Sequence, residues 1–319
     1  MLVHLRLVVP AQLAHPVREL LVGDPRITNV TNLVGAGIDP AGDLMGADAA
    51  RESADEVLGA LRRLGLGRDG SISITVPQAT PFDAADRIEE LADGEPDDSV
   101  MWDVVLAQAS DAAKPSRSFQ LFLTLATALA AIAVLTDSPI LVVGAMVVGP
   151  DFGPVGAVCT GLVCRRWRLA VRAAALLARG YLAAILVVAL LALLGRAAGV
   201  VTADQVAGPR PLTGFIWRPD LWSVLVAIIA GMAGALALTA EKSNTLVGVF
   251  IAVTTVPAAG NLALALATWL PSEINGSLAQ LAVNVVGLLV GGVAVLGGQR
   301  LFGTGPITRS GHHGIARAD

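Results

Sequence analysis

Residues 138–164 read SPILVVGAMVVGPDFGPVGAVCTGLVC, an apolar stretch long enough to cross a bilayer. Its middle is interrupted by Gly149-Pro150-Asp151-Phe152-Gly153-Pro154. Each proline removes a backbone donor and clashes with the preceding turn, and a carboxylate at membrane depth is costly to bury. Irregular backbone survives at that depth only where protein or a water-filled cavity covers it. We therefore expect Asp151 and the broken segment to serve a function; the alternative is a kinked packing helix with Asp151 near an interface.

The composition indicates an integral membrane protein. Of 319 residues, 54% are hydrophobic and only 15% are charged, and the mean hydropathy is +0.68. Residues 1–117 contain 19 acidic and 10 basic side chains, which predicts a soluble, acidic front domain. That acidity argues against nucleic acid as a partner, because binding phosphates requires a basic face.

The first 79 residues predict a small α+β domain. Alternating apolar residues favour strands over 2–9, 27–34, 43–49 and 71–76, and helical spacing favours helices over 11–22 and 51–64. The order βαββαβ is typical of a ferredoxin-like, ACT-like fold. Gly35-Ala36-Gly37 is interpreted as a plain turn rather than a ligand-binding loop.

Residues 80–118 are predicted to be a helical linker, residues 119–300 a transmembrane domain and residues 301–319 a flexible C-terminal tail. The linker contains an amphipathic helix over 99–112, for which we expect docking on the soluble domain rather than on the membrane surface. Six spans follow, at 119–136, 139–164 (broken), 169–194, 221–240, 245–270 and 278–296.

Basic residues near the span ends predict the orientation of the chain. Lys and Arg lie before the first span, between spans two and three, at Lys242 between spans four and five, and after the sixth span. All of them fall on one side if there are six spans, so both termini are expected in the cytoplasm of a bacterial cell, with the spans in its inner membrane.

The two sets of three spans indicate an internal repeat. A shift of 107 residues places Pro150 on Pro257 and Gly153 on Gly260. Because each half has an odd number of spans, the repeat would be inverted, an arrangement that lines a midplane site with broken helices in transporters. The candidate site for an ion or polar solute comprises Gly149, Pro150, Asp151, Gly153, Pro154, Thr254, Thr255, Pro257, Asn261 and Asn284. For Asn284 the alternative is ordinary hydrogen bonding between helices.

The remaining residues argue against catalysis. Cys159 and Cys164 are five apart on one predicted helix and are not expected to form a disulfide, and the four histidines are not placed to bind a metal. No Ser/His/Asp arrangement, phosphate-binding loop or pair of intramembrane carboxylates is present in the sequence. We expect no enzyme activity and no cofactor.

Two segments resemble the bacterial DUF389 family. Its hallmark, D-S-P…GAM…P…GP, matches Asp137-Ser138-Pro139 and the residues that follow up to Pro154, and residues 234–239 with the Pro257 span look like its second signature. The likeness is greatest to the actinobacterial branch, in which an acidic residue follows the first proline. Many other members have an apolar residue there, so the resemblance implies that Asp151 is a feature of a subtype. It implies a multi-spanning domain joined to a small cytoplasmic domain, and it supplies no substrate, cofactor or catalytic residue.

Two functions fit the sequence. The first is a transporter or channel for an ion or small polar solute, with the soluble domain as a regulatory or assembly module. The second is a membrane-anchored oligomeric interaction or signalling protein without transport, which would have a solid core at the breaks. Glycine-rich helix faces favour a homo-oligomer in either case.

Overall fold

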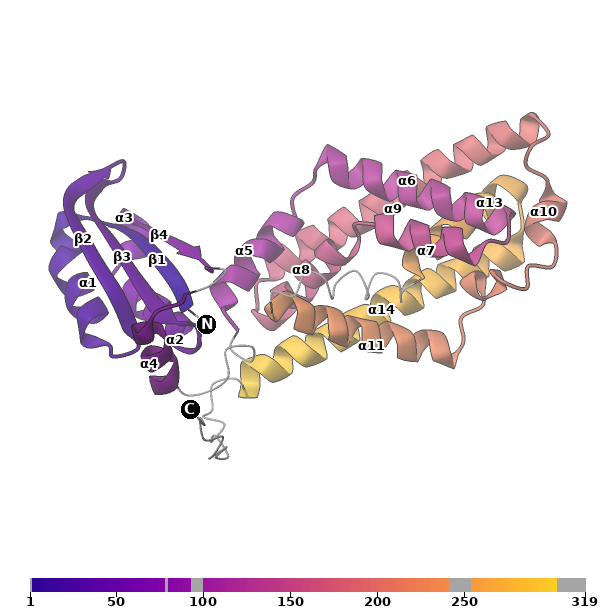
Figure 1. Cartoon of the computed structure of the whole chain (residues 1–319). Helices are drawn as coiled ribbons and strands as arrows, with labels where there is room; N and C mark the ends of the chain where they lie inside the picture. The colour runs from indigo at the N-terminus through magenta and orange to yellow at the C-terminus, as the bar shows by residue number, and fades with distance from the viewer. Residues whose placement is uncertain (1, 78–79, 93–99, 241–253, 303–319) are drawn as a thin grey trace, which may run out of the picture. The chain divides into compact units, whose positions relative to one another are not determined.

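The computed structural model describes residues 2–77, 80–92, 100–240 and 254–302. They form two compact units (Figure 1). The first unit contains the described residues up to Asp103, and the second runs from Val104 to Phe302. The boundary falls inside the expected linker. Lys242, the start of the expected fifth span and the tail beyond Phe302 lie outside the described residues.

A sheet of four antiparallel strands forms the centre of the first unit, in the order β2-β3-β1-β4. The strands are β1 (Leu2–Val9), β2 (Ile27–Ile38), β3 (Ala41–Ala50) and β4 (Ser71–Thr75). All four lie where the sequence predicts strands. Both β2 and β3 are longer than expected, because Gly35-Ala36-Gly37 lies at an irregularity within β2 rather than in a turn, and Gly37 still pairs with Gly42.

Alternate residues of β1 form the core of this unit. Leu5, Leu7 and Val9 are fully buried, and the period of two along a strand puts them on one face. The helices α1 (Ala11–Gly23) and α2 (Arg51–Arg63) contact the sheet and bury their apolar residues, including Leu21 and Leu58. The core of the first unit therefore forms where the apolar residues of the strands and of the two helices pack together, as their periodicities in the sequence predict.

Two further helices complete the first unit. A single turn, α3 (Leu66–Asp69), precedes β4 and is absent from the sequence prediction, because four residues carry no periodic signal. The helix α4 (Asp83–Leu91) packs Ala85 and Ile88 against Leu2 of β1. Residues 83–91 therefore belong to the packed first unit rather than to a free linker.

The second unit is a bundle of helices. Its members are α5 (Trp102–Ala112, which begins at the unit boundary), α6 (Arg117–Leu135), α7 (Pro139–Val148), α8 (Phe152–Val163), α9 (Trp167–Ala197), α10 (Ala203–Ala207), the 3-10 turn η2 (Gly214–Trp217), α11 (Leu221–Thr239), α13 (Thr255–Thr268) and α14 (Pro271–Phe302). Ala109 of α5 and Ala113 pack against α8 and α9. The end of α5 thus docks on the helical bundle, whereas Asp103 at its start forms an ion pair with Arg62 of α2, in line with the expected docking on the soluble domain.

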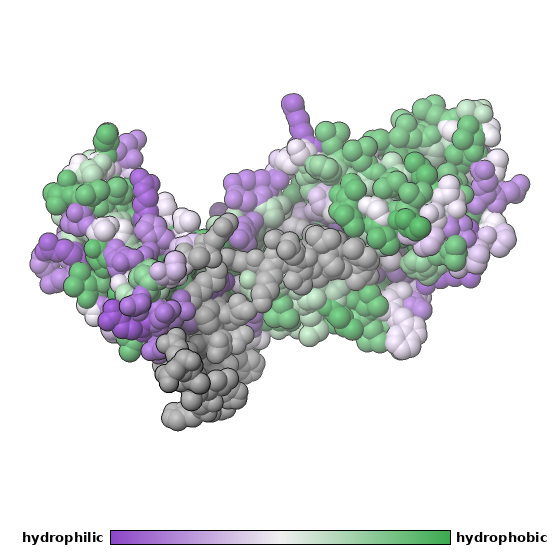
Figure 2. Space-filling model, in the orientation of Figure 1, coloured by the Kyte–Doolittle hydropathy of each residue, from purple (hydrophilic) through white to green (hydrophobic). Residues whose placement is uncertain are grey.

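Among the described residues, four helices are long and apolar enough to cross a membrane: α6, α9, α11 and α14. The pair α7 and α8 passes the same test together, with a bend of 54° between them, and α13 is a shorter apolar helix. These helices lie where the sequence predicts spans. Their surface is dominated by exposed hydrophobic side chains (Figure 2).

Glycine allows α11 and α14 to approach closely. A Cβ at Gly291 would lie 2.0 Å from the carbonyl oxygen of Ile228, and one at Gly231 would lie 2.3 Å from that of Leu288. A Cβ at Gly287 would lie 2.5 Å from Ala227 Cβ. The backbones of the two helices therefore approach closely at these glycines.

Candidate functional site

The break between α7 and α8 has a direct cause in the sequence. Pro150 and Pro154 have no amide hydrogen, so the carbonyls of Met146 and Pro150 lose the donors that a continuous helix would supply. Gly149 ends α7 with extended backbone angles, φ −66° and ψ 127°. The chain then restarts as α8 at Phe152, with Pro154 buried in its first turn.

Asp151 lies in this break and joins three segments of the bundle. Its carboxylate Oδ2 accepts a hydrogen bond of 2.7 Å from the Tyr181 hydroxyl on α9 and one of 2.6 Å from the Thr255 hydroxyl at the start of α13. The side chain is only 7% exposed. Neither donor carries a charge, so the hydroxyl groups stabilise Asp151 by hydrogen bonding alone.

The start of α13 makes a second set of polar contacts, to α14. Thr254 Oγ1 accepts hydrogen bonds from Asn284 Nδ2 at 2.9 Å and from Gln280 Nε2 at 3.1 Å. Gln280 is 1% exposed, and its carbonyl oxygen Oε1 is buried without a partner among the described residues. Together, Asp151, Thr255, Thr254, Asn284 and Gln280 form what we call the polar centre.

The polar centre brings together residues that are far apart in sequence. Gly149 also approaches α13, since a Cβ there would lie 2.7 Å from Val256 Cγ2. Pro257 occupies the first turn of α13, a position where a helix tolerates proline, so it begins this helix instead of breaking it. Gly153 faces α5, where its Cβ would lie 3.5 Å from Ala112 Cβ.

Asn261 lies in a different group, which we call the Arg210 cluster. Its Oδ1 accepts a 2.7 Å hydrogen bond from Arg210 Nη1, and its Nδ2 donates to Glu273 at 3.1 Å and to Ser277 at 2.9 Å. Arg210 and Glu273 are joined by an ion pair of 2.5 Å, and each side chain is 5% exposed. The sequence analysis assigned Asn261 to the site at the breaks; the contacts place it here because its side chain turns toward α14 and the Arg210 loop.

Several of these residues were not predicted from the sequence. Tyr181 is the only tyrosine of the chain, and an isolated phenol in an apolar span was a usable signal. Gln280 precedes Asn284 by four residues, which puts both on one face of α14. Arg210 and Glu273 lie between predicted spans, in residues 195–220 and 271–277, and no sequence periodicity relates residue 210 to residue 261.

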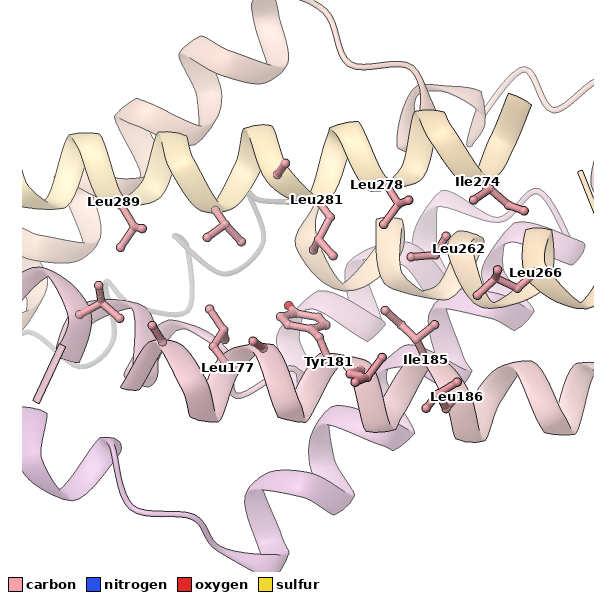
Figure 3. Close-up of a pocket in the computed structure, with 16 residues that line it drawn as sticks. Leu177, Tyr181, Ile185, Leu186, Leu262, Leu266, Ile274, Leu278, Leu281 and Leu289 are labelled. Atoms are coloured by element: carbon pink, nitrogen blue, oxygen red, sulfur yellow. The ribbon is translucent and has the colours of Figure 1, made fainter. Parts of the chain in front are cut away.

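A groove lies beside the polar centre, between α9 and α14 (Figure 3). Its volume is about 610 Å³, and α8 and α13 also contribute to its lining. Among the described residues that line it, Tyr181 alone has a polar side-chain atom. Figure 3 shows the Tyr181 ring projecting from α9 toward α14, between Leu177 and Ile185. One side chain therefore contacts both the groove and Asp151.

Metal binding has no support among the described residues, which contain no group of three or more His, Cys, Asp or Glu side chains placed to hold an ion. Cys159 and Cys164 are free thiols. The chemistry that the polar centre offers is therefore that of one carboxylate with hydroxyl and amide groups around it, in an apolar surrounding.

Comparison with known proteins gives one family and one relative. The model of DUF389, a domain of unknown function, matches residues 146–290, a range that includes both Asp151 and the start of α13. An uncharacterized protein of Methanocaldococcus jannaschii is 23% identical over 208 residues. That match covers 65% of this chain and 62% of the relative, less than two thirds of its length. No solved structure matches the chain.

Proposed function

We propose that this chain, a member of the DUF389 family, is an integral membrane protein that transports or conducts an ion or a small polar solute. The observation that carries this proposal is the contact between the break at Asp151 and the start of α13. The Asp151 carboxylate meets the Thr255 hydroxyl within an apolar bundle. A helix break and a helix start that meet in this way offer backbone and side-chain oxygens to a solute.

Insertion of the second unit into a membrane is supported by its helix lengths and surface. A span needs about 20 apolar residues to cross a hydrocarbon core of about 30 Å. The helices α6 and α11 have 19 residues each, and α9 has 31. With the α7–α8 pair counted as one span and the segment that ends in α13 as another, the protein would have six spans. We place them in a bacterial inner membrane, with both termini in the cytoplasm.

An inverted repeat is supported by the positions of the helices. The starts of α6 and α11, Arg117 and Leu221, are 104 residues apart, and so are the starts of α9 and α14, Trp167 and Pro271. The hydrogen bonds from Tyr181 to Asp151 and from Asn284 to Thr254 each join residues 30 positions apart. The helix starts favour a shift of 104, three residues less than the shift that pairs the two prolines.

The helix packing and the groove lining also support two halves related by a shift of 104 residues. Both α8 and α13 contact α9 and α14, so each packs against a long helix of either half. The groove lining contains six pairs of residues separated by 104 positions: 158 and 262, 174 and 278, 177 and 281, 178 and 282, 181 and 285, and 185 and 289. A groove on a pseudo-twofold axis would have this composition.

For the first unit we propose a ferredoxin-like, ACT-like domain in the cytoplasm that regulates or assembles the membrane unit. Two features support the assignment, namely the element order with helices after β1 and β3, and the strand order β2-β3-β1-β4. The second strand lies at an edge of the sheet, and its Val34 and Ile38 are exposed, which favours a role in homo-oligomer formation.

A membrane-anchored oligomeric signalling or interaction protein is the second candidate. It is favoured by the groove, whose lining is apolar, and by the internal hydrogen bonds that already engage Asp151 and Thr254. A solid core of this kind is what a purely structural membrane unit would have.

Flux measurements separate the two candidates. The purified protein is reconstituted in liposomes loaded in turn with indicators for H⁺, Na⁺ and K⁺. We expect flux of at least one ion above empty liposomes, and a decrease of about tenfold in Asp151→Asn, equivalent to about 1.4 kcal/mol. Pro257→Ala is measured alongside, and the matched control is Asp204→Asn, at an exposed position in α10. Equal flux in Asp151→Asn and Asp204→Asn would remove the proposed site, and an impermeable parent protein would favour the signalling candidate.

A further inference from the structure

The groove between α9 and α14 lies on the apolar side of Tyr181 and takes no part in the polar centre. We propose that it binds the acyl chain of a membrane lipid. This inference rests on insertion of the second unit into a membrane, but it does not require transport.

The chemistry of the lining selects an apolar ligand. Apart from Tyr181, the described lining residues are Val, Ala, Leu and Ile, and the Tyr181 hydroxyl already donates to Asp151. Water in such a space would lack the two to four polar partners that ordered water needs. A hydrocarbon chain leaves no polar group unpaired on entering, and it gains dispersion contacts with both helices that offset its lost conformational freedom.

The shape of the groove favours an acyl chain over an α-helix as its ligand. On α14 the lining runs from Ile274 to Leu289, about 22 Å at a rise of 1.5 Å per residue. A volume of 610 Å³ over that length gives a mean cross-section of about 27 Å². An α-helix, about 10 Å in diameter with its side chains, needs about 80 Å². A helix from a second copy of this chain is therefore too wide to enter the groove whole, whereas a single hydrocarbon chain can lie along it.

The groove is hollowed by small residues and opens on the outer surface. Ala178 on α9 and Ala282 on α14 line it where larger side chains would fill it. Leu182 and Leu278, also in its lining, are 59% and 49% exposed. In a bilayer these leucines would contact lipid, so an acyl chain can enter from the side without crossing a polar barrier.

A photoactivatable lipid tests the proposal. The full chain is reconstituted in vesicles of phosphatidylethanolamine and phosphatidylglycerol that contain a phospholipid with a diazirine in one acyl chain, and labelled residues are mapped by mass spectrometry. We expect labels to concentrate on residues 174–186 and 278–289. Ala178→Phe and Ala282→Phe should reduce that labelling about tenfold by filling the groove. The control Ile229→Phe, on the exposed face of α11, should leave it unchanged.

The pattern of labelling decides the outcome. Labels as dense on the exposed faces of α6 and α11 as in the groove would indicate ordinary surrounding lipid and overturn the inference. Labels on those faces with none in the groove would also overturn it, while membrane insertion would stand. If neither the groove nor the exposed helix faces were labelled, both the lipid inference and membrane insertion would be overturned. The map of the parent protein decides among these results even if a phenylalanine variant fails to fold, and none of them depends on ion flux.

Discussion

Arg210 shows at the scale of single residues how much a buried charge depends on its partners. Its guanidinium contacts Glu273 and Asn261, and all three side chains are buried. Removing one member of such a pair leaves the other charge unpaired, which costs about 3–5 kcal/mol. We expect Arg210→Met to lower the free energy of unfolding by that amount, measured by denaturant unfolding in detergent.

The double variant Arg210→Met with Glu273→Leu distinguishes this cause from lost packing. Removing both charges should recover most of the stability, since no unpaired charge remains. Arg218→Met, in the same loop but exposed over the Trp217 ring, is the matched control and should cost less than about 1 kcal/mol. Additive losses in the double variant would contradict the argument.

Two carboxylates of the first unit have pKa values shifted in opposite directions. Hydrogen bonds from the Arg26 side chain lower the pKa of Asp24 below its ordinary value of 3.8. Burial, with a smaller effect from the Asp103 carboxylate, raises the pKa of Asp55. Asp24 therefore contributes stability that is present above pH 3.8 and is lost as the pH falls through its folded pKa. Ionised Asp55 is instead a cost, which is relieved as the pH falls through its raised pKa.

Neutral variants should reproduce these signs. At pH 7 we expect Asp24→Asn to decrease, and Asp55→Asn to increase, the protection of β1 amides from hydrogen exchange in the full chain. The Asp55→Asn difference should shrink as the pH falls through the raised pKa of Asp55, whereas the Asp24→Asn difference should persist until the pH falls below 3.8. Changes of equal sign in the two variants would show that the shifts do not govern stability.

At the scale of elements, the contact between α11 and α14 depends on glycine. A Cβ at Gly291 would meet the Ile228 carbonyl at 2.0 Å, whereas at Gly297 on the same helix no described residue lies within 4 Å of the corresponding position. Gly291→Ala should lower the unfolding free energy by about 1–3 kcal/mol through forced separation of the helices. Gly297→Ala should be neutral or stabilise by up to about 1 kcal/mol, because alanine favours a helix. Equal effects in a thermal unfolding assay would refute the packing explanation.

The elements also show what sequence alone can and cannot predict here. Periodicity placed the four strands and the long helices, since each buries one face or is apolar throughout. Proline chemistry placed the break at Gly149–Asp151. The contacts of the site depend on which helices meet: Asp151 with Tyr181 spans 30 residues, Thr255 with Asp151 spans 104, and Arg210 with Glu273 spans 63. Local patterns carry no information on such separations, so they did not relate Tyr181 to Asp151 or Asn261 to Arg210.

At the scale of the whole molecule, the repeat makes a demand that membrane topology can test. If the halves are inverted, residues 104 positions apart lie at opposite faces of the membrane. The chain crosses the membrane three times between two such residues, so the second lies on the side opposite the first. The basic residues predict that Arg117 and Trp167 lie in the cytoplasm, and Leu221 and Pro271 on the other side. The four positions are exposed and begin α6, α9, α11 and α14, so single cysteines there can be labelled.

In a chain whose own cysteines are replaced, we expect Leu221→Cys and Pro271→Cys to react with a membrane-impermeant maleimide in intact cells. Arg117→Cys and Trp167→Cys should react only after the membrane is permeabilised. The two pairs test independently whether residues 104 positions apart lie on opposite sides of the membrane. A parallel repeat, or a chain with one span fewer between the halves, would place both members of each pair on one side. Labelling of Arg117→Cys and Leu221→Cys from the same side would therefore exclude the inverted arrangement, and with it the argument that the segment at Asp151 and the start of α13 are equivalent parts of one site.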